Sequence, residues 1–152
     1  MEREARILKV CKLDGRHLGG TFFPPMLIEL NSAGQLTHEE FGPILHLYRY
    51  RAEQLQDVLK AIRDSGFALT LGVQTRIDAV WREVFRSTST GNTYVNRNMI
   101  GAVVGVQPFG GNGLSGTGPK AGGPHSLLRF AVERAISVNI AAQGGDPALL
   151  NL

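Results

Sequence analysis

The hydrophobic positions in the middle of the chain follow two different periods in turn. Residues 44–50 (ILHLYRY) alternate between apolar and polar or aromatic side chains, which predicts a strand. The following segment predicts a helix that ends at Gly66, because apolar residues recur there at helical spacing, namely Leu55, Val58, Leu59 and Ile62.

The same order of elements is repeated directly afterwards. Residues 67–75 (FALTLGVQT) predict a second strand, and residues 92–96 (NTYVN) predict a third. Between them lies a second helical stripe, formed by Ile77, Val80, Trp81 and Val84. Strands and helices that alternate at this spacing predict an α/β fold built from parallel βαβ units with right-handed crossovers. We expect Trp81 to lie in the core.

The flanking segments are less regular. Residues 7–13 predict a short strand before the Asp14-Gly15 turn, and residues 21–30 predict an extended segment because two prolines exclude a helix. Near the end of the chain, residues 124–131 predict a short helix. Residues 134–140 (RAISVNI) alternate and predict a final strand.

A glycine-rich stretch from Gly101 to Gly123 follows the third predicted strand. It holds nine of the nineteen glycines of the chain, with Phe109 near its centre. Glycine is costly to order, so such a loop usually needs positive φ angles or a close approach of bare backbone. In α/β sheets, ligands bind beyond the carboxyl ends of the strands. The pattern therefore predicts a binding loop that offers backbone N–H groups and one aromatic ring.

Two phosphate-binding motifs are only partly matched within this stretch. Residues 111–116 (GNGLSG) fit G-x-G-x-x-G, but Gln107-Pro108 precedes them and Thr117-Gly118-Pro119 follows, so neither the strand nor the helix of a dinucleotide fingerprint is in place. Residues 118–120 lack the spacer and the hydroxyl residue of a P-loop. We therefore interpret the stretch as neither motif, and Lys120 as a solvated charge.

The composition narrows the function classes. The chain of 152 residues has a net charge of +3, and its basic residues are mixed with acids, which argues against nucleic-acid binding. No run of eighteen apolar residues predicts a membrane segment. Cys11 is the single cysteine, lies among apolar residues and is expected to be a buried, inert thiol in a reducing compartment such as the cytoplasm. The four histidines show no metal-ligand spacing, so we expect no metal.

The second chemical feature is Glu39-Glu40-Phe41-Gly42-Pro43. A carboxylate here is able to accept hydrogen bonds from a sugar diol, and the ring is able to lie against a flat heterocycle. The alternative interpretation is a solvated loop with a packed phenylalanine.

These residues together resemble the aldehyde dehydrogenase family. Residues 39–43 resemble its E-x-F-G-P motif, and residues 91–98 (GNTYVNRN) followed by QPFGGNGLSGTGPKAGG resemble the closing part of its catalytic domain. The likeness is greatest to the L-glutamate γ-semialdehyde (Δ1-pyrroline-5-carboxylate) dehydrogenase module of the bifunctional proline utilisation A flavoenzymes, and it runs from about Gly19 to the last residue.

The resemblance implies roles for five residues. Glu39 matches the residue that binds the nicotinamide ribose hydroxyls of NAD, and Phe41 matches the ring beside that ribose. Gly101 and Ala102 match the loop whose N–H groups hold the α-carboxylate of glutamate semialdehyde, and Phe109 matches an aromatic wall of the aldehyde channel. Exposed N–H groups in a glycine-rich turn suit a carboxylate.

The resemblance also implies that the catalytic cysteine and the NAD-binding domain of the family precede the residues seen here, so no catalytic residue is assigned and the isolated chain is expected to be inactive. FAD is expected only if a proline dehydrogenase module is present upstream. Residues 1–132 are expected to belong to the catalytic domain, and residues 133–152 to an oligomerisation strand and tail, which implies self-association. The alternative function is a non-catalytic domain for assembly or for binding a small acid.

Overall fold

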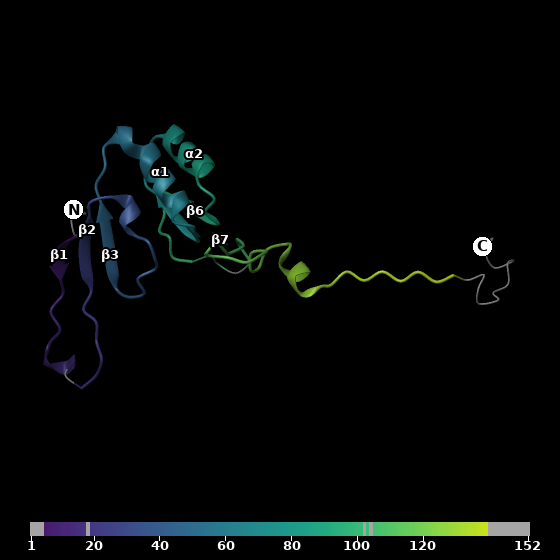
Figure 1. Ribbon diagram of the computed structural model, residues 1–152, viewed down its shortest axis with the longest axis horizontal. Helices are drawn as coiled ribbons and strands as arrows, with labels where there is room; N and C mark the ends of the chain where they lie inside the picture. The colour runs from purple at the N-terminus through teal and green to yellow at the C-terminus, as the bar shows by residue number, and fades with distance from the viewer. Residues whose placement is uncertain (1–4, 18, 102, 104, 140–152) are drawn as a thin grey trace.

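The computed structural model describes residues 5–17, 19–101, 103 and 105–139 (Figure 1). Its first layer is a three-stranded sheet in the order β1 (Arg6–Val10), β2 (Met26–Leu30) and β3 (Ile44–Tyr48). β1 and β2 are antiparallel, whereas β2 and β3 are parallel. The two prolines lie just before β2, where their missing N–H groups cost no ladder hydrogen bond.

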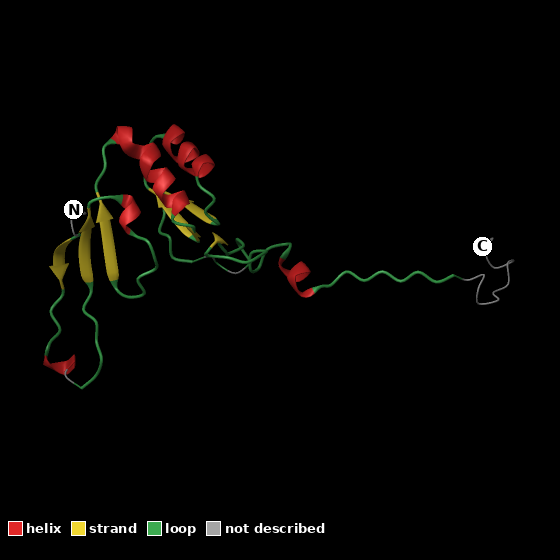
Figure 2. Cartoon of the chain, viewed as in Figure 1, coloured by secondary structure: helices red, strands yellow, loops and turns green. Residues whose placement is uncertain are grey.

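The second layer is the βαβ unit that the sequence predicts. β5 (Thr70–Val73) and β6 (Asn92–Val95) pair in parallel, and α2 (Asp78–Ser87) connects them. α1 (Leu55–Asp64) packs beside α2, and both helices cover these strands (Figure 2). The core cluster of this layer consists of one residue from each of three elements, Leu59, Val73 and Val84, with Trp81 packed against it. The predicted helices and the core position of Trp81 are thus confirmed.

The predicted strand at residues 67–75 differs from the observed one. It is divided at a bend into β4 (Phe67–Ala68) and β5, because the two parts have different partners. β4 pairs antiparallel with β7 (Asn112–Gly113), a strand that the sequence does not predict, whereas β5 pairs with β6. Within the described residues β3 does not pair with β5, so the sheets are mixed rather than purely parallel.

Short 3-10 helices occupy several of the turns, at η1 (Gly15–His17), η2 (Ala33–Gln35), η3 (Ala52–Gln54) and η4 (Ser126–Phe130). η4 lies within the predicted short helix. Residues 131–139 then run as an exposed extended segment away from the two layers (Figure 1). A strand at residues 134–140 needs a partner for its hydrogen bonds, so it stays a prediction, and residues 140–152 lie outside the described residues. No helix in the described parts of the chain is long and apolar enough to cross a membrane.

Candidate functional site

The carboxyl ends of β5 and β6 are joined by one side chain. Asn96, directly after β6, has a φ of 54° and donates its own N–H to the Val73 carbonyl at 2.9 Å. Its side-chain amide makes a reciprocal pair with Thr75, accepting from the N–H at 2.9 Å and donating to the carbonyl at 2.8 Å. The chain therefore leaves this end of the sheet from a fixed point.

Gly101 lies beyond that carboxyl end and is exposed. Its φ is 43°, a left-handed conformation that favours glycine. Among the described residues its N–H has no hydrogen-bond partner, so the group is available to an anion. Ala102, its expected partner in the anchor loop, lies outside the described residues.

In the later part of the glycine-rich stretch, several backbone N–H groups are engaged within the protein. Phe109 and Ala121 exchange two backbone hydrogen bonds of 3.0 and 2.9 Å. The Leu114 N–H donates to the Gly66 carbonyl at 2.9 Å, and the Ser115 N–H donates to the Asn112 carbonyl at 3.0 Å. The expectation that this stretch offers free N–H groups therefore does not hold for these particular amides.

Phe109 lies near the amino end of β6. The Pro108 carbonyl accepts a hydrogen bond of 3.0 Å from the side chain of Asn92, the first residue of the strand, and so holds Phe109 at the amino end. Gly101, by contrast, comes after the carboxyl end of β6 in the sequence. Phe109 itself is half-buried.

Glu39 lines a cleft of about 460 Å³. The lining comes from the loop before β3, from β3 itself, from residues 67–70 and from the glycine-rich stretch: Leu36, His38, Glu39, Glu40, His46, Phe67, Leu69, Thr70, Leu114 and Ser115. Two contacts lie at the cleft: the Ser115 Oγ accepts a hydrogen bond from the Ala68 N–H at 3.0 Å, and His38 Nε2 lies 2.6 Å from Glu40 Oε1. The volume of the cleft lies within the range of small-molecule sites.

Phe41 is 97% exposed and does not line this cleft, so the alternative interpretation of a packed phenylalanine is wrong. The ring stands free because Gly42 and Pro43 turn the chain directly into β3. An exposed carboxylate at a cleft and a free ring two residues away fit the ribose and ring of a nicotinamide cofactor.

In the described part of the chain, no group of three or more His, Cys, Asp or Glu residues could hold a metal ion.

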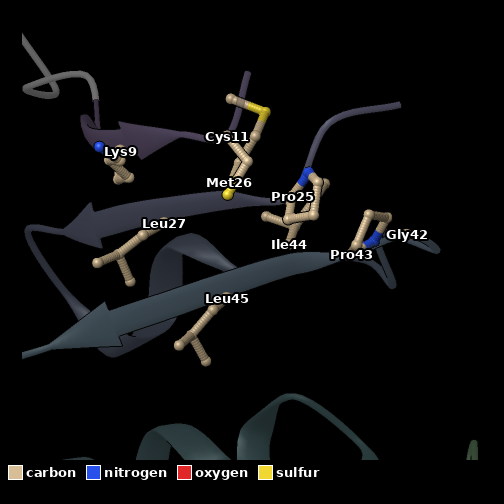
Figure 3. A pocket seen from close by; sticks show the side chains of 9 residues that line it. All are labelled: Lys9, Cys11, Pro25, Met26, Leu27, Gly42, Pro43, Ile44 and Leu45. Atoms are coloured by element: carbon tan, nitrogen blue, oxygen red, sulfur yellow. The ribbon is translucent and has the colours of Figure 1, made fainter. Parts of the chain in front are cut away.

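Cys11 is exposed, and the expectation of a buried thiol is wrong. It lies just beyond β1, where its N–H donates to the Pro25 carbonyl at 2.9 Å and its side chain faces a largely apolar groove of about 410 Å³ (Figure 3). Apolar neighbours in the sequence did not indicate burial here, because Val10 and Leu13 are themselves 41% exposed. The groove shares no lining residue with the Glu39 cleft.

Sequence reasoning missed the far wall of the Glu39 cleft. Leu114 and Ser115 lie within the glycine-rich stretch, but no periodicity links them to Glu39, and only the pairing of β4 with β7 brings them there.

The interpretation of Lys120 as a solvated charge is wrong. It is half-buried, and its Nζ donates to the Gly91 carbonyl and, at 3.4 Å, to Asn92 Oδ1.

The fold and the Glu39 motif define a class of protein, and the sequence comparison agrees with it. The sequence model of the family described as "Aldehyde dehydrogenase family" matches residues 2–136. The chain therefore belongs to the aldehyde dehydrogenase family, and its α/β fold is part of the fold of that family.

Within this family the chain is related to the PutA proteins and to 1-pyrroline-5-carboxylate dehydrogenases. It is 55% identical over 133 residues to the bifunctional protein PutA of Klebsiella aerogenes, with 86% of this chain and 10% of that protein covered. It is 37% identical over 120 residues to the 1-pyrroline-5-carboxylate dehydrogenase of Staphylococcus saprophyticus, with 78% of this chain and 23% of that protein covered. A crystal structure of a variant of proline utilization A from Bradyrhizobium japonicum matches with a TM-score of 0.79 and 57% identity, over 91% of this chain and 14% of that one. The chain thus spans a small part of the length of these relatives.

Proposed function

We propose that this chain is a segment of an NAD-dependent L-glutamate γ-semialdehyde dehydrogenase of proline catabolism, which oxidises the semialdehyde to glutamate in the longer enzyme. The observation that carries the proposal is the 55% identity to a bifunctional PutA protein over 86% of the chain. The Gly101 N–H, which has no partner among the described residues, and the exposed carboxylate of Glu39 at its cleft support it independently.

In this proposal each predicted site residue has a defined role. The Glu39 carboxylate accepts hydrogen bonds from the nicotinamide ribose hydroxyls, and the Phe41 ring lies beside that ribose. The N–H groups of Gly101 and Ala102 hold the α-carboxylate of the substrate, because convergent backbone N–H dipoles favour an anion. Phe109 forms an aromatic wall of the aldehyde channel. NAD, when bound, accepts the hydride from the substrate.

We also propose that the segment associates with further copies of itself through residues 133–139, and that the enzyme works in the cytoplasm. Ile136 and Val138 are both exposed along this extended segment, although they are apolar. Such a segment combines an extended backbone with exposed apolar side chains, which is the pattern of a strand that pairs with another chain.

The test uses the full-length protein that contains this segment and follows NADH formation from glutamate semialdehyde. We expect Glu39→Gln to raise KM for NAD about tenfold, because the amide replaces charge-assisted hydrogen bonds by weaker neutral ones. The matched control is Glu53→Gln, because Glu53 is an exposed glutamate of η3 that does not line the cleft. An equal effect of both substitutions, or a full-length protein that forms no NADH, would contradict the proposal.

The segment alone is expected to form no NADH, since the proposal gives it binding residues and no nucleophile. NADH production by the segment alone would overturn that part of the proposal. Binding of glutamate by the full-length protein without NAD turnover would favour the alternative function, a non-catalytic domain that binds a small acid.

A further inference from the structure

The amino end of β6 carries a buried polar side chain that the proposed chemistry does not use. Asn92 is 8% exposed and is the one buried polar residue among those that the structure describes. Burying a side-chain amide costs free energy unless the amide forms hydrogen bonds. The partners of Asn92 therefore indicate its structural role. Among the described residues, the hydrogen bonds of its side chain go to Pro108, Gly110 and Lys120 of the glycine-rich stretch rather than to the sheet.

Two of these bonds lie on either side of Phe109. Asn92 Nδ2 donates to the Pro108 carbonyl at 3.0 Å, and Asn92 Oδ1 accepts from the Gly110 N–H at 3.3 Å. One side-chain amide therefore holds the peptide group before Phe109 and the peptide group after it. The N–H and the carbonyl of Phe109 itself form hydrogen bonds with Ala121. The backbone at Phe109 is therefore held by the Asn92 side chain and by the opposite chain segment at Ala121.

Lys120 fixes the orientation of the Asn92 amide. Its Nζ lies 3.4 Å from Oδ1 and also donates to the Gly91 carbonyl. Because an ammonium group only donates, it selects the orientation in which Oδ1 faces Lys120 and Gly110 while Nδ2 faces Pro108. The neighbouring backbone is closely packed, since a Cβ at Gly91 would lie 1.9 Å from the Gly110 carbonyl oxygen.

We propose that Asn92 is the positioning residue for Phe109: its amide fixes the backbone on both sides of the ring and so sets where the ring stands in the aldehyde channel. This inference rests on the proposed function for the role of the ring, and on the hydrogen bonds above for the role of Asn92. Lys120 acts one step further away, by holding the amide in the required orientation.

The test is a double-mutant cycle in the full-length enzyme. Phe109→Leu should raise KM for the aldehyde about tenfold, the loss expected for one aromatic contact. Asn92→Ala should raise the same KM by a similar factor with KM for NAD unchanged, and the double variant should be no worse than either single variant. The proposal would be overturned if the two effects added up in the double variant. It would also be overturned if Asn92→Ala raised KM for the aldehyde and KM for NAD equally.

A matched control and a milder variant separate positioning from general damage. Asn112 also donates its side-chain amide to a backbone carbonyl, that of Ser89, but does not flank Phe109, so Asn112→Ala should leave the aldehyde KM within about twofold. Asn92→Asp keeps the acceptor for Gly110 and Lys120 and loses the donor to Pro108, so its effect should lie between wild type and Asn92→Ala. The proposal would be contradicted if Asn92→Asp left the aldehyde KM unchanged while Asn112→Ala raised it.

A second readout does not depend on activity. In Asn92→Ala and Asn92→Asp, the amides of Phe109 and Gly110 should exchange hydrogen at least about tenfold faster, whereas those of β5 should be unchanged. Faster exchange in a protein without dehydrogenase activity would leave the positioning of Phe109 standing and remove the proposed function. Unchanged exchange would remove the positioning role, whatever the activity.

Discussion

Glu83 shows how a single surface residue joins two helices. It lies on α2, and its Oε1 accepts hydrogen bonds from Ser87 Oγ on the same helix at 2.9 Å and from Gln56 Nε2 on α1 at 3.1 Å. Hydrogen bonds to the charged form favour it, so Ser87 first and Gln56 second lower the pKa of the Glu83 carboxyl below its ordinary value. A lowered pKa stabilises the fold above the unfolded-state pKa, and this contribution is lost as the pH falls through the lowered value.

We expect Ser87→Ala to raise the pKa of Glu83 towards its ordinary value, and Gln56→Ala to raise it by less. The measurement is the titration of the Glu83 side-chain carbon by NMR in each variant. Gln74→Ala is the control, because the Gln74 amide makes a comparable hydrogen bond to the Arg97 carbonyl at a different place. A larger effect of the control than of Ser87→Ala would show that the helix contacts do not set this pKa.

At the scale of elements, the stability of the βαβ layer depends on the cluster between α1, α2 and β5. Leu59 is 2% exposed at its centre, so Leu59→Ala should lower the free energy of unfolding by about 2–5 kcal/mol through lost burial and a cavity. Leu45→Ala is the matched control, because Leu45 is 66% exposed on β3 and should cost about 0.5 kcal/mol or less. Denaturant unfolding of both variants measures the difference, and equal losses would contradict this location of the core.

The same elements show what the sequence determines locally. The helices α1 and α2 were predictable because their apolar residues repeat at the helical period over ten residues each. The pairing of β4 with β7 was not, since each strand has two residues and the pair depends on Gly113, whose φ is 58°, and on the Ser115 side chain bonded to the Ala68 N–H. A strand of two residues is too short to show a periodic pattern of apolar and polar side chains.

The site follows the same division. Glu39, Phe41, Gly101, Ala102 and Phe109 were found through motifs that resemble a known family, and their roles stay predictions. The cleft beside Glu39 was not predictable, because it forms only where chain segments about 75 residues apart meet. Asn92 and Lys120 were missed for the same reason. The Asn92 amide binds the Pro108 carbonyl and the Lys120 ammonium binds the Gly91 carbonyl, and such contacts with backbone atoms far along the chain leave no signature in the sequence.

At the scale of the whole molecule, the chain exposes more surface than a compact monomer of its size. Its accessible surface is 12595 Å². A compact protein of the same mass would expose about 7,600 Å². Part of the excess lies in residues 130–139, where Ile136 is 90% exposed and apolar residues recur along the extended backbone. Exposed apolar surface of this kind is typical of an interaction surface.

We therefore expect the protein to form dimers or larger oligomers through this segment. Ile136 and Val138 lie two residues apart, so in a paired strand they would share one face and Ser137 would point to the other. Ile136→Asp should weaken association at least about tenfold, because it places a charge in the apolar contact, whereas Ser137→Asp adds the same charge on the opposite face and should change the association constant by less. Sedimentation equilibrium over a range of concentrations measures both constants. A wild-type protein that remains monomeric throughout, or equal weakening by both substitutions, would show that residues 133–139 do not pair in this way and that the apolar surface is covered by another contact.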